Sequence, residues 1–542
     1  MVLSLIKIFM TRIRGSELLI QILEENNVQY IFGVPGDIEN EFFADLKGSQ
    51  IEFFNTMHEQ SGAIMADVYA RLTDNLGVCF STLGPGATNM LTGVANANQD
   101  RSSLLALSGQ LPSGSQHQDS HQHVELDSLY EPVTKESFVV QRSIDIGVDI
   151  NRAIYEAKSA RKGAVHVSLP IDTLKKDASS HRTAEYSQTS SFQYESALVD
   201  LYAAIADSDS TLAIIGKCVS AHREVKSFVE AYNIPFYTSF QGKGVIPASH
   251  SLNCGVLSRH SEVVKNTLQD QDLILTIGYD LLEGVSPEMW NGVETVAHID
   301  RAAPTGPVHI NSPDIEVIGE ISTILAEMVT VYEPVKQEID DISSMVWKIE
   351  APEGIENNYP LHPAKIVKTL NALLGDRDIV IPDVGLHKQA VGLYYEAEQP
   401  NTVLFSNGLS QMGFCVPAAI VAQFVCPEQN VVGVSGDCGF HMNVQELTVA
   451  VQREIPVTYI VFNDGGYGMV KAAQLTSERT HYAAELPTRC DFAAIAEGFG
   501  ATGFTVDSAE ELDDTLSQAI TADDVTVVDI PIEQYSDIEM IQ

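Results

Sequence analysis

One stretch decides the fold class of this 542-residue chain: VVGVSGDCGFHMNVQELTVAVQREIPVTYIVFNDGGYGMV, residues 431–470. Two apolar runs with strand character, 431–434 and 456–462, flank a segment whose pattern predicts a helix ending near residue 453. Each run leads into a turn that places an acid near glycine, Asp437 in the first and Asp464 in the second. A strand–helix–strand order predicts parallel strands, whose carboxyl ends emerge at the same edge of a sheet. Both acids are therefore expected at one edge.

The same alternation of strands and helices recurs along the chain in three blocks. Polar residues 177–195, rich in Ser and Thr, and the polar stretch 332–360 separate the blocks and are interpreted as linkers. Alternating strands and helices predict parallel sheets with helices on both faces. We therefore expect an α/β fold of three doubly wound parallel-sheet domains, residues 10–178, 196–332 and 361–535.

Composition and charge exclude several classes of partner. Hydrophobic residues make up 44% of the chain, yet no apolar run approaches the ~18 residues of a membrane-spanning helix. The net charge of −41 opposes binding to nucleic acid or to an anionic membrane. It fits either a high-salt source or an ordinary acidic enzyme. Seven scattered cysteines without metal-site spacing predict reduced thiols. The short apolar start, residues 1–9, lacks the order of a secretory signal, so a cytoplasmic protein is expected.

The two acids after the strands suggest a cation site. Carboxylate and backbone oxygens are hard ligands that suit Mg²⁺ or Ca²⁺. Helix N-termini after each turn would supply N–H donors for phosphate groups. On spacing alone, a helix N-cap at Asp437 and a turn former at Asp464 fit equally well.

The detailed sequence pattern favours a cation site over purely structural roles for the two acids. Gly436-Asp437-Cys438-Gly439, followed after a helix by Asn463-Asp464 and by Tyr467-Gly468-Met469, resembles the signature of thiamine-diphosphate enzymes. The resemblance implies Mg²⁺ ligation by Asp437, Asp464 and the backbone carbonyl of Gly466, with Asn463 in the turn. Two further segments, PDVGLHKQAVGLYY and FSNGLSQMGFCVPAAI, resemble the family's diphosphate loop and its "GxxxMG" segment. The cofactor-binding residues implied are Val384, Gly385, His387, Ser410, Met412, Gly436, Asp437, Cys438, Gly439, Asn463, Gly468 and Met469.

Three of these residues have particular implied roles. Met412 would lie under the cofactor and force its bent shape, and the Ser410 carbonyl would accept a hydrogen bond from the pyrimidine amino group. Cys438 is a departure, because relatives carry glycine at this position. We hypothesise that its thiol makes the site sensitive to oxidation or alkylation.

The first block supplies a candidate activating residue. In FFNTMHEQSGAIMADVYARL, Glu59 begins a predicted helix among apolar neighbours. A helix-start glutamate is by itself unremarkable, because the helix dipole favours it. The whole segment, however, resembles that of the family's activating glutamate, which hydrogen-bonds the cofactor's pyrimidine ring. The resemblance therefore implies that the first domain binds the pyrimidine, the third binds the diphosphate and Mg²⁺, and the second lies between them.

Within this family, the chain is most similar to the acetolactate synthase branch, over residues 12–535, and to its catabolic, flavin-free type. The segments IGYDLLEGVSPEMWN, VAHID and PDIEVIGEI, together with Asp464, carry that choice. Ser120-His121-Gln122 occupies the place of the branch's "THQ", so His121 and Gln122 are candidates for orienting substrate. No Gly-rich dinucleotide fingerprint occurs in the middle block, so FAD is not expected.

The resemblance implies a carboligase that condenses pyruvate with a second 2-oxo acid to give 2-acetolactate and CO₂. Active sites between chains would make it a homodimer or homotetramer. Asp37 and Met57 stand where the catabolic type has basic residues, and alanines replace the Trp that selects the acceptor in biosynthetic relatives. The alternatives are therefore a simple 2-oxo acid decarboxylase, a carboligase with another acceptor, and a non-catalytic subunit.

Overall fold

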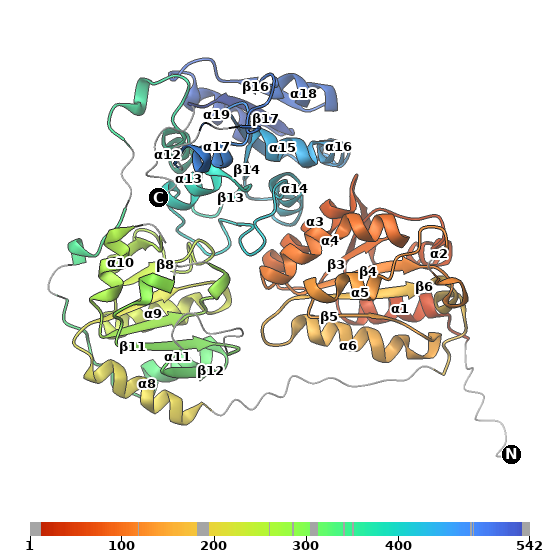
Figure 1. Ribbon diagram of the computed structural model, residues 1–542, viewed down its shortest axis with the longest axis horizontal. Helices are drawn as coiled ribbons and strands as arrows, with labels where there is room; N and C mark the ends of the chain where they lie inside the picture. The colour runs from red at the N-terminus through yellow and green to blue at the C-terminus, as the bar shows by residue number, and fades with distance from the viewer. Residues whose placement is uncertain are drawn as a thin grey trace. The chain divides into compact units, whose positions relative to one another are not determined.

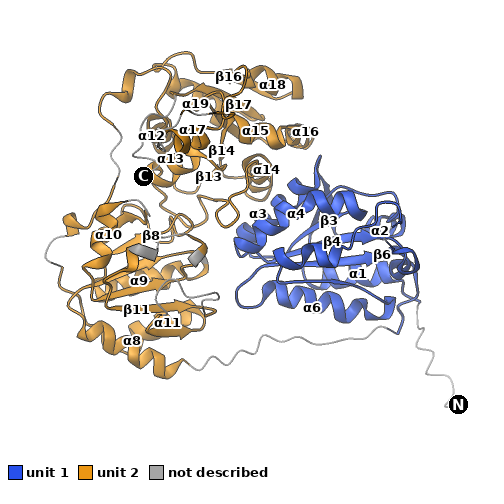
Figure 2. Cartoon of the chain, viewed as in Figure 1, with its two compact units in different colours: residues 1–189 blue, residues 190–542 orange. Residues whose placement is uncertain are grey.

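The computed structural model describes residues 12–117, 119–180, 194–258, 261–283, 287–303, 313–339, 342–348, 352–476, 480 and 482–533 (Figure 1). The chain forms two compact units, residues 1–189 and 190–542 (Figure 2). The apolar start, most of the first predicted linker and the end of the third predicted domain lie outside the described residues.

The first unit is built around a six-stranded parallel sheet in the order β2-β1-β3-β4-β6-β5. Its strands are β1 Tyr30–Gly33, β2 Glu52–Asn55, β3 Gly77–Ser81, β4 Leu104–Gln110, β5 Glu136–Val139 and β6 Ala164–Pro170. Its helices are α1 Gly15–Glu25, α2 Asn40–Leu46, α3 Glu59–Thr73, α4 Leu83–Gln99, α5 Leu126–Tyr130, α6 Ile146–Lys158 and α7 Ile171–Lys175. Strands β3, β4 and β6 are buried along their whole length, because helices cover both faces of a parallel sheet.

The second unit holds two more parallel sheets. The first has the order β12-β11-β10-β7-β8-β9. Its strands are β7 Thr211–Ile215, β8 Phe236–Thr238, β9 Asn253–Val256, β10 Leu273–Ile277, β11 Thr295–Asp300 and β12 Ile315–Ile318. Its helices are α8 Glu195–Asp207, α9 His222–Tyr232, α10 Glu262–Gln269 and α11 Ile321–Thr330.

The last sheet has the order β13-β14-β15-β17-β16. Its strands are β13 Ile379–Pro382, β14 Val431–Gly436, β15 Thr458–Asn463, β16 Thr502–Thr505 and β17 Thr526–Pro531. Its helices are α12 Pro363–Leu373, α13 Leu386–Tyr394, α14 Cys415–Val425, α15 Asp437–Asn443, α16 Leu447–Gln452, α17 Gly468–Thr476, α18 Phe492–Phe499 and α19 Leu512–Ile520. In the register, Gly436 pairs with Phe462, so β14 and β15 end side by side.

The predicted α/β fold with three parallel sheets is thus confirmed. The boundaries 10–178, 196–332 and 361–535 remain our proposal, supported by one sheet falling in each range. None of the helices in the described ranges combines the length and apolar character needed to span a bilayer.

The expected helix between the two acids is interrupted. It divides into α15 and α16, with a 3₁₀ turn, Val444–Glu446, between them. The break follows Asn443, whose φ of −133° is not helical and whose amide donates to the Gly413 carbonyl at 2.6 Å. A tertiary hydrogen bond therefore takes precedence over the local helical pattern.

Candidate functional site

A pocket of about 490 Å³ lies at the carboxyl edge of β13, β14 and β15. Turns after three neighbouring strands form it, as expected for a ligand site in an open parallel sheet. The predicted residues that line it are Val384, Gly385, His387, Met412, Gly436, Asp437, Cys438, Gly439, Asp464, Gly466, Gly468 and Met469. The structure thus brings most of the predicted cofactor and metal residues of the second unit into one cavity.

The two acids of the opening stretch are both buried in this pocket. Asp437 is 2% exposed, and its carboxylate accepts the backbone N–H groups of Cys438 at 2.6 Å and Gly466 at 2.9 Å. Asp464 is 6% exposed, and its Oδ2 has no hydrogen-bond partner among the described residues. The Lys471 ammonium lies 3.6 Å from that oxygen and donates to the Asp464 carbonyl. Backbone N–H groups therefore hold the Asp437 carboxylate in place. Asp464 instead keeps one buried oxygen that could bind a ligand.

Burial raises the pKa of both carboxyl groups. For Asp464, the charge of Asp437 is the next largest cause of the raised pKa, so the two acids repel each other. A bound cation would relieve this repulsion and occupy the unsatisfied Asp464 oxygen. The described residues contain no cluster of three or more His, Cys, Asp or Glu side chains suited to a metal. Two carboxylates therefore need further oxygens, from backbone or ligand, to complete a shell.

A neutral histidine also lines this pocket. His387 is 6% exposed, and burial lowers its pKa to about 3. Its Nε2 is buried without a hydrogen-bond partner in the described structure. A Cβ at Gly436 would lie 3.0 Å from the imidazole, so glycine makes room for the ring. An unsatisfied ring nitrogen in a pocket fits a site for a polar ligand such as a phosphate group.

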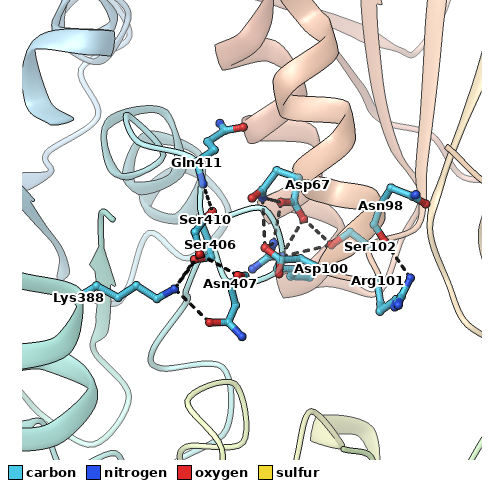
Figure 3. Close-up of polar contacts among 12 residues, drawn as sticks. Asp67, Asn98, Asp100, Arg101, Ser102, Lys388, Ser406, Asn407, Ser410 and Gln411 are labelled. Carbon is cyan, nitrogen blue, oxygen red and sulfur yellow. Dashed lines mark hydrogen bonds and ion pairs between the residues drawn. The ribbon is translucent and has the colours of Figure 1, made fainter. Parts of the chain in front are cut away.

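The loop that carries Met412 is anchored by residues the sequence analysis missed. Asp383, fully buried after β13, accepts the N–H groups of Gly413 at 3.0 Å and Cys415 at 3.3 Å. Burial raises its pKa to about 6. Lys388 on α13 donates to the Ser406 carbonyl at 2.8 Å, as Figure 3 shows. The sequence does carry a signal for Asp383, because this acid directly follows a strand, as Asp437 does.

Two predicted residues lie outside the pocket lining, and one inside it, Cys438, has a thiol with a raised pKa. Asn463 donates to the Cys490 carbonyl and to Asp529, both at 2.9 Å, which places its amide in the turn. Ser410 is exposed, and its hydroxyl donates to the Asn407 carbonyl at 2.8 Å. Burial, followed by the charge of Asp437, raises the pKa of Cys438 to about 12. In the metal-free protein that thiol is therefore protonated near neutral pH.

Two of the candidate catalytic residues of the first unit, Glu59 and Gln122, adjoin the start of α4. Glu59 is the first residue of α3, is half-buried, and accepts the Asn89 amide at 3.0 Å. A Cβ at Gly86 would lie 3.1 Å from the Glu59 carboxylate. His121 and Gln122 are exposed, and the Gln122 carbonyl accepts the Gly84 N–H at 3.0 Å. The first turn of α4 therefore adjoins both Glu59 and the loop of the predicted substrate residues.

The same sheet edge contains a buried carboxyl group that sequence reasoning missed. Glu39 is 2% exposed and accepts the Thr82 hydroxyl at 3.0 and 3.1 Å. Burial raises its pKa to about 7. A side chain at Gly109 would overlap the Glu39 carboxylate, so the acid occupies space that glycine leaves. No sequence pattern signals this contact, which joins residues far apart in the chain.

Comparison with known proteins matches each of the three sheets to a known domain family. Three family models match the chain: "Thiamine pyrophosphate enzyme, N-terminal TPP binding domain" at residues 13–129, the central domain at 198–328 and the C-terminal TPP binding domain at 383–530. A protein named probable acetolactate synthase large subunit from Methanococcus aeolicus is 30% identical, covering 97% of this chain and 93% of its own. The acetolactate synthase of Bacillus subtilis is 31% identical, covering 97% and 94%. The acetolactate synthase isozyme 3 large subunit of Escherichia coli is 31% identical, covering 94% and 93%.

Proposed function

The chain belongs to the acetolactate synthase family of thiamine pyrophosphate enzymes, and from this premise we propose that it condenses pyruvate with a second 2-oxo acid. With pyruvate as the acceptor, the products are 2-acetolactate and CO₂. The observation that carries the proposal is the pocket after β13, β14 and β15. There, two buried acids and an unsatisfied histidine nitrogen fit a metal-bound diphosphate.

The residues present suit the cofactor that the family implies. We assign the diphosphate-bound Mg²⁺ to Asp437, Asp464 and the Gly466 carbonyl, because these are hard oxygen donors at two adjacent strand ends. When bound, thiamine diphosphate supplies the electron sink that the decarboxylation of a 2-oxo acid requires. His387 and the first turns of α15 and α17 face the region where phosphate oxygens would lie.

Other residues of the chain would position the reactants. Glu59 would hold a proton against the pyrimidine ring, with Asn89 orienting its carboxylate. Met412 would support the cofactor from a loop that Asp383 fixes. His121 and Gln122 are exposed in the described chain, which leaves them free to contact substrate.

Flavin independence and assembly also belong to the proposal. The middle domain carries no Gly-rich dinucleotide fingerprint, which supports activity without FAD. The similar proteins include both plain synthases and large subunits at nearly the same identity. The assignment to the catabolic type therefore rests on the sequence motifs alone. We propose a homodimer or homotetramer whose active sites combine Glu59 of one chain with Asp437 of another.

One experiment tests the reaction. The purified protein is incubated with thiamine diphosphate, Mg²⁺ and pyruvate, without FAD, and the products are identified by mass spectrometry. We expect 2-acetolactate and CO₂. Acetaldehyde without acetolactate would identify a simple decarboxylase instead. Turnover only with an added amine or aldehyde would identify a carboligase with a different acceptor.

A further inference from the structure

A second cavity, open to solvent, lies within the second unit and shares no lining residue with the cofactor pocket. Residues of β8 and β9 form one wall, and α12 and the end of α13 form the other. Lys243, Lys348 and Lys368 line it together with Trp347 and Tyr394. The lining thus combines lysines and aromatic residues with one carboxylate, that of Glu396.

The walls of this cavity are held by hydrogen bonds on both sides. The backbone N–H of Trp347 donates to the Cys254 carbonyl at 2.8 Å, which ties the tryptophan to β9. Asn371 donates to the Tyr394 carbonyl at 2.8 Å and accepts the N–H of Glu396 at 3.0 Å. The cavity is therefore pre-formed, which lowers the entropic cost of binding a ligand.

The two sheets are also joined directly beside the cavity. The N–H of Ala248 donates to the Ala397 carbonyl at 3.0 Å, and the rings of Phe240 and Phe405 stack at 5.2 Å. A ligand in this position would contact both α/β layers of the second unit.

Among the described residues that line the cavity, three lysines face a single carboxylate, that of Glu396, which also attracts the Lys243 ammonium. Lys243 is 9% exposed, and its ammonium donates to the Gly392 carbonyl at 3.0 Å rather than to a carboxylate. Burial lowers its pKa to about 8. Lys348 lies 3.7 Å from Glu396, but both side chains are more than half exposed, so this pair is weak. Lys368 forms no ion pair within the described ranges. The lining thus carries more lysine than carboxylate charge, in a chain of net charge −41.

We propose that this cavity binds a small phosphorylated ligand with an aromatic ring, of the mononucleotide class. The planar ring would pack on Trp347, because indole and nucleobase surfaces stack favourably. The phosphate would lie against Lys348 and Lys368 and bring negative charge close to the buried Lys243 ammonium. The proposal does not depend on the reaction at the other pocket.

Binding can be measured on the holoenzyme, saturated with thiamine diphosphate and Mg²⁺ so that the cofactor's own phosphate site is filled. AMP, adenosine and inorganic phosphate are titrated separately by calorimetry. The Trp290→Phe variant, which leaves Trp347 as the only indole, gives a fluorescence readout at the cavity. We expect AMP to bind and to change Trp347 emission, with adenosine and phosphate each binding at least about tenfold more weakly.

Matched variants separate a specific site from general attraction. The double substitution Lys348→Gln and Lys368→Gln should weaken AMP binding at least about tenfold. Lys226→Gln with Lys265→Gln removes the same charge from exposed helix surfaces and should leave binding unchanged. The proposal is overturned if millimolar AMP produces neither heat nor an emission change, if adenosine binds as tightly as AMP, or if both double variants behave alike.

Discussion

Buried acids follow three neighbouring strands, but their surroundings give them different roles. Asp383 accepts hydrogen bonds from Val384, Gly413 and Cys415, so the backbone saturates it. Asp464 instead keeps one buried oxygen without a hydrogen-bond partner in the described structure. Because an unsatisfied buried carboxylate is unfavourable, it is the atom most in need of a ligand. Residue identity is the same at these positions, but only Asp464 keeps a buried carboxylate oxygen without a hydrogen-bond partner in the described structure.

This difference predicts the effect of Asp464→Asn. We expect the Mg²⁺ concentration that stabilises the cofactor complex to rise at least about tenfold, because an anionic oxygen ligand is lost. The stability of the metal-free protein should change little, because the repulsion from Asp437 is removed together with the ion pair to the buried Lys471 ammonium. Thermal unfolding with thiamine diphosphate, titrated with Mg²⁺, measures both effects. Asp376→Asn, an exposed change, is the control. An unchanged Mg²⁺ midpoint in Asp464→Asn would contradict the assigned ligand.

Glu39 predicts a pH dependence of stability. Its pKa is about 7 in the folded protein, against an ordinary value of 4.5. Between these values the folded state retains a proton that the unfolded state releases, so the free energy of unfolding falls as the pH rises. The contribution of Glu39 to the free energy of unfolding is fully present below pH 4.5 and is lost as the pH rises through 7. The total loss is up to about 3 kcal/mol.

Glu39→Gln should flatten this part of the profile, because the amide does not titrate. Urea unfolding of the first unit at several pH values between 4.5 and 8 measures the slope. Glu25→Gln, at an exposed position at the end of α1, should keep the wild-type slope. Identical slopes in wild type and Glu39→Gln would show that Glu39 ionises normally.

At the scale of elements, the loop between α13 and α14 depends on anchors at both ends of its segment 406–413. Lys388 holds its start through the Ser406 carbonyl and the Asn407 amide oxygen, at 2.8 and 3.0 Å. Asp383 holds its end through Gly413, whose φ of +80° favours glycine. Met412 lies just before this second anchor and lines the pocket. The loop is positioned by side chains from β13 and α13 rather than by its own sequence.

Lys388→Met should therefore loosen this loop without removing a pocket residue. We expect faster amide hydrogen exchange in residues 406–413 and a weaker affinity for thiamine diphosphate, by about tenfold. Exchange mass spectrometry and calorimetry measure the two effects. Lys336→Met, an exposed substitution in the second unit, is the matched control. Unchanged exchange in 406–413 would show that Asp383 alone is sufficient as an anchor.

At the scale of the whole molecule, the residues that we propose for the active site divide between the two compact units. Glu59 belongs to the first unit and Asp437 to the second. If active sites form between chains, a mixed dimer of Glu59→Gln and Asp437→Asn chains contains one intact site and one doubly altered site. Each variant alone should lose at least about 100-fold in activity.

Co-expression of the two variants should then restore about a quarter of wild-type activity, because about half of the random dimers are mixed and half of their sites are intact. The measurement is acetolactate formation by the co-purified protein, with each variant alone as the reference. No restoration, in a sample shown by native mass spectrometry to contain mixed dimers, would place both residues in one chain's site.

The sequence by itself was sufficient for the fold class and for the main pocket. Apolar runs alternating with helical patterns determine parallel sheets, because strand burial and helix periodicity are local properties. Acids directly after strands predicted that Asp437 and Asp464 share a sheet edge, and the register of β14 and β15 confirms it. The motif resemblance led to the family to which the chain belongs.

Only the tertiary structure decided which buried side chains lie in contact with which distant residues. Glu39 and Gly109, Asp383 and Gly413, and Lys243 and Gly392 meet across long sequence separations. The insertion of β17 between β15 and β16 is likewise invisible in local patterns. The physical reason is that periodicity and turn chemistry depend on neighbours in sequence. The hydrogen-bond partner of a buried acid or lysine depends on which distant segment packs against it.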